Sequence, residues 1–104
     1  MKPTKQIAAE RRDLVESLGL DPNRSRRWTK KWINLKCSAR AKGVDSLLTL
    51  KQYLKLAVRA GIKDPDEINR TGGFQMSRLT DAGDYSWGTC RFLLAQDNIV
   101  ETVS

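Results

Sequence analysis

Residues 49–61 read TLKQYLKLAVRAG and decide the fold, because they contain the clearest amphipathic helix in the chain. Apolar side chains recur at the three- and four-residue steps that line one face of an α-helix, at Leu50, Tyr53, Leu54, Ala57 and Val58. Thr49 is a suitable N-cap, and Gly61 is a suitable stop. This helix is the most clearly predicted element of the chain.

Two further helices are predicted on the N-terminal side. The first spans residues 4–18 and ends at Gly19, and a turn follows at residues 20–23. The second spans residues 25–42, with Ser25 as its cap and Gly43 as its stop.

The C-terminal part has the character of a β-hairpin. A single helical turn is predicted at Pro65, after which residues 74–79 alternate apolar with polar side chains. Residues 81–84 supply turn chemistry, residues 90–93 are apolar again, and residues 94–103 are predicted to form a short final helix.

We therefore predict an α+β fold in one domain, because 104 residues suffice for a single hydrophobic core. Residues 1–62 form its basic helical part and residues 63–104 its part with the β-hairpin and a helix.

The composition excludes several kinds of chemistry. The chain contains no histidine, which removes the usual proton shuttle at neutral pH and the commonest metal ligand. Cys37 and Cys90 stand far apart, so neither a zinc knuckle nor a disulfide framework is indicated. We expect no cofactor, no metal site and no catalytic residue. No signal peptide or membrane-spanning stretch is visible, and the expected location is cytoplasmic, in the host cell if a phage encodes the chain.

Positive charge is concentrated near the N-terminus. Residues 1–42 carry a net charge of +8 and residues 43–104 a net charge of −1. Residues 24–42 contain no acid and eight bases, which are Arg24, Arg26, Arg27, Lys30, Lys31, Lys36, Arg40 and Lys42. Such a segment attracts polyanions, and each phosphate that it neutralises releases counterions. A solvated basic face, an acidic protein partner or a membrane surface is the alternative interpretation.

The helix at 25–42 has two apolar strips. Trp28, Trp32, Leu35 and Ala39 fall on one face and are predicted to be core residues. A smaller strip, Ile33 and Cys37, lies opposite. We expect its exposure to indicate a protein partner and its burial to indicate a sandwiched helix.

The stretch from Met76 to Phe92, MSRLTDAGDYSWGTCRF, resembles the core of HNH-type (His-Me finger) endonucleases of phages and mobile elements. The spacing agrees at Arg78, Asp81, Gly83, Tyr85, Cys90, Arg91 and Phe92, and Asn98 follows. The resemblance implies a ββα unit in which a histidine on the first strand activates water, near a metal held by an Asp and by an Asn or His. It also favours DNA as the partner.

The chain departs from this family at the catalytic positions. Arg78 occupies the place of the histidine, Ser77 that of the preceding Asp, and Thr89 that of an Asn. An arginine stays protonated and cannot act as a base or bind Mg²⁺. Arg78 and its neighbour Arg91 are instead expected to attract phosphate, and Trp87 is a candidate for stacking on a base.

The sequence therefore predicts a DNA-binding protein that has lost catalysis, with helix 25–42, Arg78, Arg91 and Trp87 as its surface. Replacing Arg26, Arg27, Lys30 and Lys31 by Gln is expected to weaken binding and flatten its dependence on salt. One alternative is a phage-type inhibitor or adaptor that binds a host protein or nucleoprotein complex. Another is a metal-dependent nuclease that uses Asp81, Asp84 and Asn98, which plasmid nicking in Mg²⁺ or Mn²⁺ would reveal.

Overall fold

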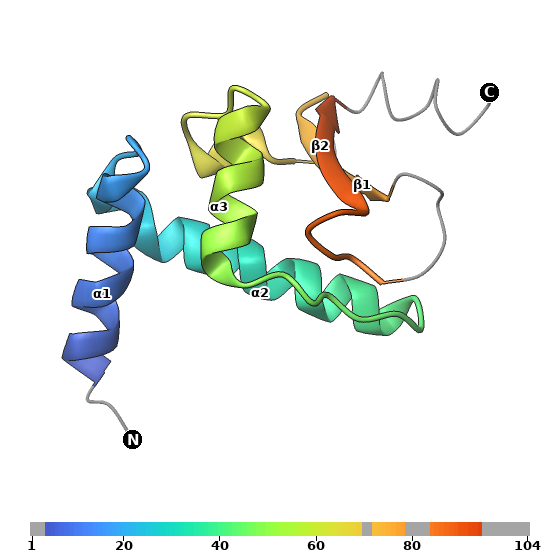
Figure 1. The fold of residues 1–104 in the computed structure, drawn as a ribbon, viewed down its shortest axis with the longest axis horizontal. Coiled ribbons are helices and arrows are strands. Elements are labelled where there is room, and N and C mark those ends of the chain that lie inside the picture. Colours follow the sequence, from blue (N-terminus) through green and yellow to red (C-terminus); the bar gives the residue numbers. More distant parts are fainter. Residues whose placement is uncertain (1–3, 70–71, 79–83, 95–104) are drawn as a thin grey trace.

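Three α-helices and one β-hairpin form the described part of the chain, which confirms the predicted α+β class (Figure 1). The computed structural model describes residues 4–69, 72–78 and 84–94. The elements in chain order are α1 (Thr4–Ser17), η1 (Pro22–Arg24), α2 (Ser25–Ala41), α3 (Leu50–Arg59), η2 (Pro65–Glu67), β1 (Phe74–Arg78) and β2 (Cys90–Leu94). None of the described helices is long and apolar enough to cross a bilayer.

Helix α3 lies at the centre of the structure. Figure 1 shows it packed across α2, with α1 beside the start of α2 and the hairpin on the other side of α3. The predicted helix is confirmed, and Leu50, Tyr53, Leu54, Leu56 and Ala57 are all buried.

The ends of α3 follow from local chemistry. The Thr49 hydroxyl accepts a hydrogen bond from the Gln52 amide at 3.2 Å, and the Gln52 side chain accepts one from the Thr49 amide at 3.1 Å. This capping box satisfies two amides that lack helical partners. Gly61 then takes a φ of +83°, which favours glycine, and ends the helix.

The predicted apolar face of α3 is wrong at Val58, whose residue surface is 42% exposed. Leu56 is buried instead. Both α2 and β2 pack on α3, so the buried face of this helix is wider than the sequence predicts. It includes Leu56 and leaves Val58 at the surface.

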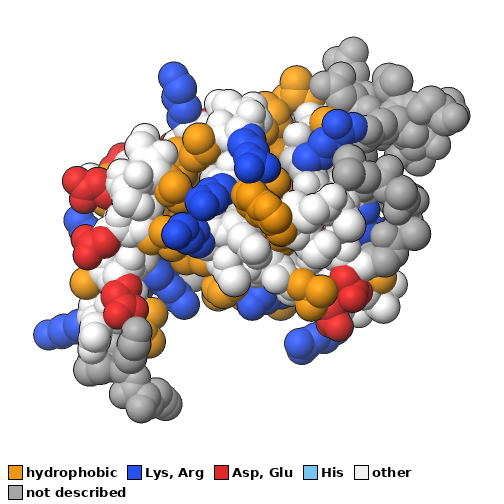
Figure 2. All heavy atoms as spheres, in the orientation of Figure 1, with side chains coloured by type: hydrophobic (Ala, Val, Ile, Leu, Met, Phe, Trp, Pro, Cys, Tyr) orange, Lys and Arg blue, Asp and Glu red, His pale blue; other side chains and the backbone are white. Residues whose placement is uncertain are grey.

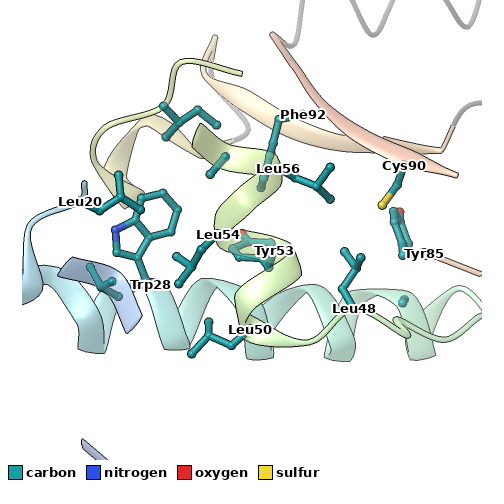
Figure 3. Packing of buried hydrophobic residues seen from close by; sticks show 14 residues of the cluster. Leu20, Trp28, Leu48, Leu50, Tyr53, Leu54, Leu56, Tyr85, Cys90 and Phe92 are labelled. Atoms are coloured by element: carbon teal, nitrogen blue, oxygen red, sulfur yellow. The ribbon is translucent and has the colours of Figure 1, made fainter. Parts of the chain in front are cut away.

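The core centres on three aromatic rings from three elements (Figure 3). Tyr53 of α3 makes edge-to-face contacts with Trp28 of α2 at 6.4 Å and with Phe92 of β2 at 5.2 Å between ring centroids. The core therefore runs without a break from the helical part into the hairpin.

The two longer helices agree with the sequence prediction except at their ends. Helix α1 ends at Ser17, one residue before the predicted end. Ser25 is the first residue of α2, and its predicted role as the N-cap is wrong. Arg24 holds the cap position without a side-chain bond, because the 3₁₀ turn η1 leads directly into the helix.

The hairpin has the predicted position and a defined register. Ser77 pairs with Arg91 and Arg78 pairs with Cys90, while Cys90 and Phe92 are buried. The predicted final helix is wrong at its start, because Leu94 is the last residue of β2. Its remaining residues, 95–103, lie outside the described residues.

Removing the Phe92 ring should destabilise the whole fold. We expect Phe92→Ala to lower the free energy of unfolding by about 3–5 kcal/mol, because it leaves a cavity beside Tyr53. Leu94→Ala is the matched control, since Leu94 lies on the same strand and is 41% exposed. Urea titration followed by circular dichroism measures both changes. Equal small losses in the two variants would contradict the central place given to these rings.

Candidate nucleic-acid interface

Tertiary contacts divide the cations of residues 24–42 into two groups, those that bond within the protein and those that stay exposed. Asp64 and Asp66, which flank the start of η2, lie beside the start of α2 and pair with two of its arginines. The Arg24 guanidinium donates to Asp64 at 3.1 Å and to Asp66 at 2.9 Å, and Arg27 donates to Asp66 at 3.0 Å. We call this set of four residues the ionic clamp.

The clamp also organises the loop that carries its acids. Asp64 caps η2 by accepting the Asp66 amide at 2.9 Å. This backbone hydrogen bond, followed by the bond from Arg24, holds the pKa of Asp64 below its ordinary value. The hydrogen bond to Asp64 in turn raises the pKa of Arg24.

A third cation of the segment is tied to the same loop. The Lys31 ammonium donates to the backbone carbonyl of Ile68 at 2.7 Å. Arg24, Arg27 and Lys31 thus stabilise the packing of the η2 loop against α2, and the charges of Arg24 and Arg27 are paired with acids of the protein.

The outer face of α2 retains its positive charge. Arg26, Lys30 and Arg40 are exposed, and among the described residues no carboxylate lies within ion-pair distance of them. Lys36 is also exposed, with its ammonium 3.9 Å from the centroid of the Trp32 ring. We call these four exposed cations the α2 face. They are the part of the predicted surface on α2 that is open to a ligand, with Arg26, Lys30 and Arg40 on its outer side and Lys36 at its edge beside Trp32.

The buried face of α2 is the predicted one. Trp28 and Ala39 are buried, and Trp32 and Leu35 pack at the edge of the core. The Trp32 indole donates to the carbonyl of Leu48 at 2.8 Å, which ties the ring to the segment before α3.

The second apolar strip of α2 is exposed. Ile33 is 45% exposed and Cys37 is also at the surface. Ile33 lines a groove of about 650 Å³ between α1 and α2, together with Ile7 and Ala8 of α1. The cations Arg11, Arg26 and Lys30 line the same groove.

The hairpin arginines do not form one site. Side chains paired directly across an antiparallel ladder share a face of the sheet, so Arg78 lies on the face of Cys90 and Arg91 on the face of Ser77. The Arg78 guanidinium is 5.3 Å from the centroid of the buried Tyr85 ring. Arg91 is exposed on the opposite face. Arg91 therefore does not lie beside Arg78 on one face of the hairpin, as the sequence led us to expect.

Trp87 lies next to α3 rather than next to the α2 face. Its ring is half-buried, and the Arg59 guanidinium covers it at 4.5 Å from the centroid. One face of the ring is thus already occupied by a cation.

A second group of cations escapes notice when net charge is summed over long stretches of the sequence. Lys51, Lys55 and Arg59 recur at steps of four on the outer side of α3, and we call them the α3 ridge. Figure 2 shows Lys and Arg side chains gathered in the middle of the view, where α3 lies in Figure 1. The signal in the sequence is that residues 46–62 contain no acid.

Three residues of the segment from Met76 to Phe92 make structural contacts. Asp84 accepts the backbone amide of Asp45 at 2.9 Å, and Thr89 forms a hydrogen bond of 2.7 Å with Ser86. The Cys90 thiol donates to the Ser86 carbonyl at 3.0 Å, and burial raises its pKa to about 11.

No group of three or more acidic or cysteine side chains is placed to hold a metal within residues 4–69, 72–78 and 84–94. Asp81 and Asn98, which the metal-dependent alternative requires, lie outside these ranges, as does Gly83 of the motif. No family model, no curated protein and no solved structure matches the chain. The likeness to HNH-type endonucleases rests on the motif residues alone.

The ionic clamp should make the stability of the fold depend on pH. The pKa of Asp64 is lowered in the folded state, so its contribution is complete above the ordinary value of 3.8 and is lost as the pH falls through the lower folded value. We expect the melting temperature to fall more steeply below about pH 4 in the native protein than in Asp64→Asn. Differential scanning calorimetry across this range tests it, and identical pH profiles would contradict the assignment.

Proposed function

We propose that this chain is a nucleic-acid-binding protein, with DNA as the favoured partner, derived from an HNH-like endonuclease whose catalytic groups are lost. The observation that carries the proposal is the α2 face, where Arg26, Lys30, Lys36 and Arg40 project from one helix without carboxylate partners among the described residues.

The spacing of these cations suits a phosphate backbone. Arg26 and Lys30 are one turn apart, and Arg40 lies about 21 Å further along the helix axis than Arg26. A surface of this length can follow several phosphates of one strand, and the release of their counterions drives association. Since the contacts would be to phosphates, the binding is expected to depend weakly on base sequence.

Loss of cleavage is supported by the residues at the catalytic positions. Arg78 stands where the resemblance places a histidine, and it cannot accept a proton from water. Its guanidinium packs on the Tyr85 ring, on the core-facing side of the hairpin. We therefore propose binding without hydrolysis.

A protein partner is the second candidate, and the exposure of Ile33 and Cys37 is the observation that favours it. The groove between α1 and α2 combines the apolar side chains of Ile7 and Ile33 with the cations Arg11 and Lys30. This combination suits an acidic segment with aliphatic side chains, such as one from a host protein that an inhibitor or adaptor would recognise.

Two pairs of substitutions test the nucleic-acid proposal with equal loss of charge. We expect Arg26→Gln with Lys30→Gln to weaken binding to a labelled duplex and to lower the salt slope by about 1.8, since two phosphate contacts disappear. Arg27→Gln with Lys31→Gln is the matched control, because these side chains bond to Asp66 and Ile68. It should change the slope much less.

Fluorescence anisotropy across a salt series measures both slopes, and circular dichroism verifies that both variants are folded. The proposed surface is wrong if the two pairs change the slope equally, or if neither pair changes it.

A further inference from the structure

We propose that the α3 ridge is a second nucleic-acid-binding face, so that one molecule can hold two duplexes at once. This inference rests on the proposed function, because it assigns a second site for the same class of ligand. The α3 ridge is the set Lys51, Lys55 and Arg59.

The charge of the ridge is not neutralised by any acid in the described part of the chain. Among the described residues, no carboxylate lies within ion-pair distance of Lys51, Lys55 or Arg59. The nearest acids in the sequence are Asp45 and Asp64, which flank the helix. Asp45 lies before the capped start of α3, and Asp64 belongs to the ionic clamp with Arg24.

The ridge has a length that suits a phosphate backbone. Lys51 and Arg59 stand at the two ends of the ridge, about 12 Å apart along the helix axis at a rise of about 1.5 Å per residue. Successive phosphates of one strand advance by roughly 3.4 Å along the duplex axis, so the ridge passes several of them. Three cations in a row on a rigid helix can contact them without the loss of backbone entropy that a loop would suffer.

Arg59 is held in place by its contact with Trp87. The guanidinium sits 4.5 Å from the ring centroid, and the ring packs against the edge of the core. A guanidinium that stacks on an aromatic ring keeps its edge available to donate to phosphate oxygens. The contact also connects the ridge to the hairpin that resembles the HNH unit.

The ridge and the α2 face point to different sides of the molecule. Helix α3 packs on the side of α2 that carries Trp28, and Arg26 and Lys30 lie on the side of α2 turned away from it. Figure 2 views the side of the α3 ridge. Lys51 and Lys55 likewise lie on the side of α3 turned away from Tyr53, which contacts Trp28. Both helices therefore stand between these lysines and Arg26 and Lys30, so a straight duplex on one face cannot also contact the other. Two faces on two sides therefore imply two bound segments.

A capture experiment with two duplexes tests this inference. A biotinylated duplex is immobilised on beads, the protein is added, and unbound protein is washed away. A fluorescent duplex is then added at low salt. We expect the native protein to retain the fluorescent duplex on the beads. Lys51→Gln with Lys55→Gln should retain at least about tenfold less of it, because two phosphate contacts are lost, while the protein itself stays on the beads through the α2 face.

The matched control removes the same charge from α1. Lys5→Gln with Arg12→Gln changes two exposed cations that belong to neither face and do not line the groove between α1 and α2, and it should retain the fluorescent duplex as the native protein does. Both pairs leave the contact between Arg59 and Trp87 intact, and circular dichroism verifies that they are folded.

The outcomes separate the two proposals. If the beads retain no native protein, the proposed function itself fails. The second face is refuted if they retain the protein but no fluorescent duplex. The ridge is also refuted if its double variant captures the fluorescent duplex as well as the α1 variant does, since bridging would then arise elsewhere, for instance from self-association.

Discussion

The packing of Tyr53 between Trp28 and Phe92 is the interaction on which the rest of the structure depends. It joins α3 to α2 on one side and to β2 on the other, and it makes a small helical unit and a two-stranded hairpin share one core. A hairpin alone is marginally stable in water, so its register and the places of Arg78 and Arg91 are secured by this packing. Burial in this core also raises the pKa of Tyr53.

The same packing decides which charges face solvent. By covering the Trp28 side of α2, α3 leaves Arg26, Lys30 and Arg40 on the outside and turns its own Lys51, Lys55 and Arg59 outward. The η2 loop then folds onto the start of α2 and neutralises Arg24 and Arg27 through Asp64 and Asp66. One contiguous run of cations in the sequence thus becomes a clamp that stabilises the fold and a face that is open to a ligand.

Periodicity and turn chemistry predict the elements of this fold well, because helix α3, its Thr49 cap and the two strands depend on local patterns. The errors arise where distant residues act. The exposure of Val58 depends on how widely α3 is covered, and the pairing of Arg24 with Asp64 joins residues 40 positions apart. The separation of Arg78 from Arg91 depends on strand register, which the motif spacing does not contain. The cations of the α3 ridge stand in an acid-free stretch of the sequence. The acids that follow residue 63 cancel their charge when the net charge of residues 43–104 is summed.

The central claim is that the charge exposed by this packing binds nucleic acid, and the most direct measurement is the affinity of the native protein for a labelled DNA duplex as a function of salt. The account predicts binding at low salt, with the logarithm of the association constant falling linearly as the logarithm of the salt concentration rises. An absence of binding at low salt, with the protein shown to be folded, would contradict it. The groove between α1 and α2, with its exposed Ile33, would then mark a site for an acidic protein partner.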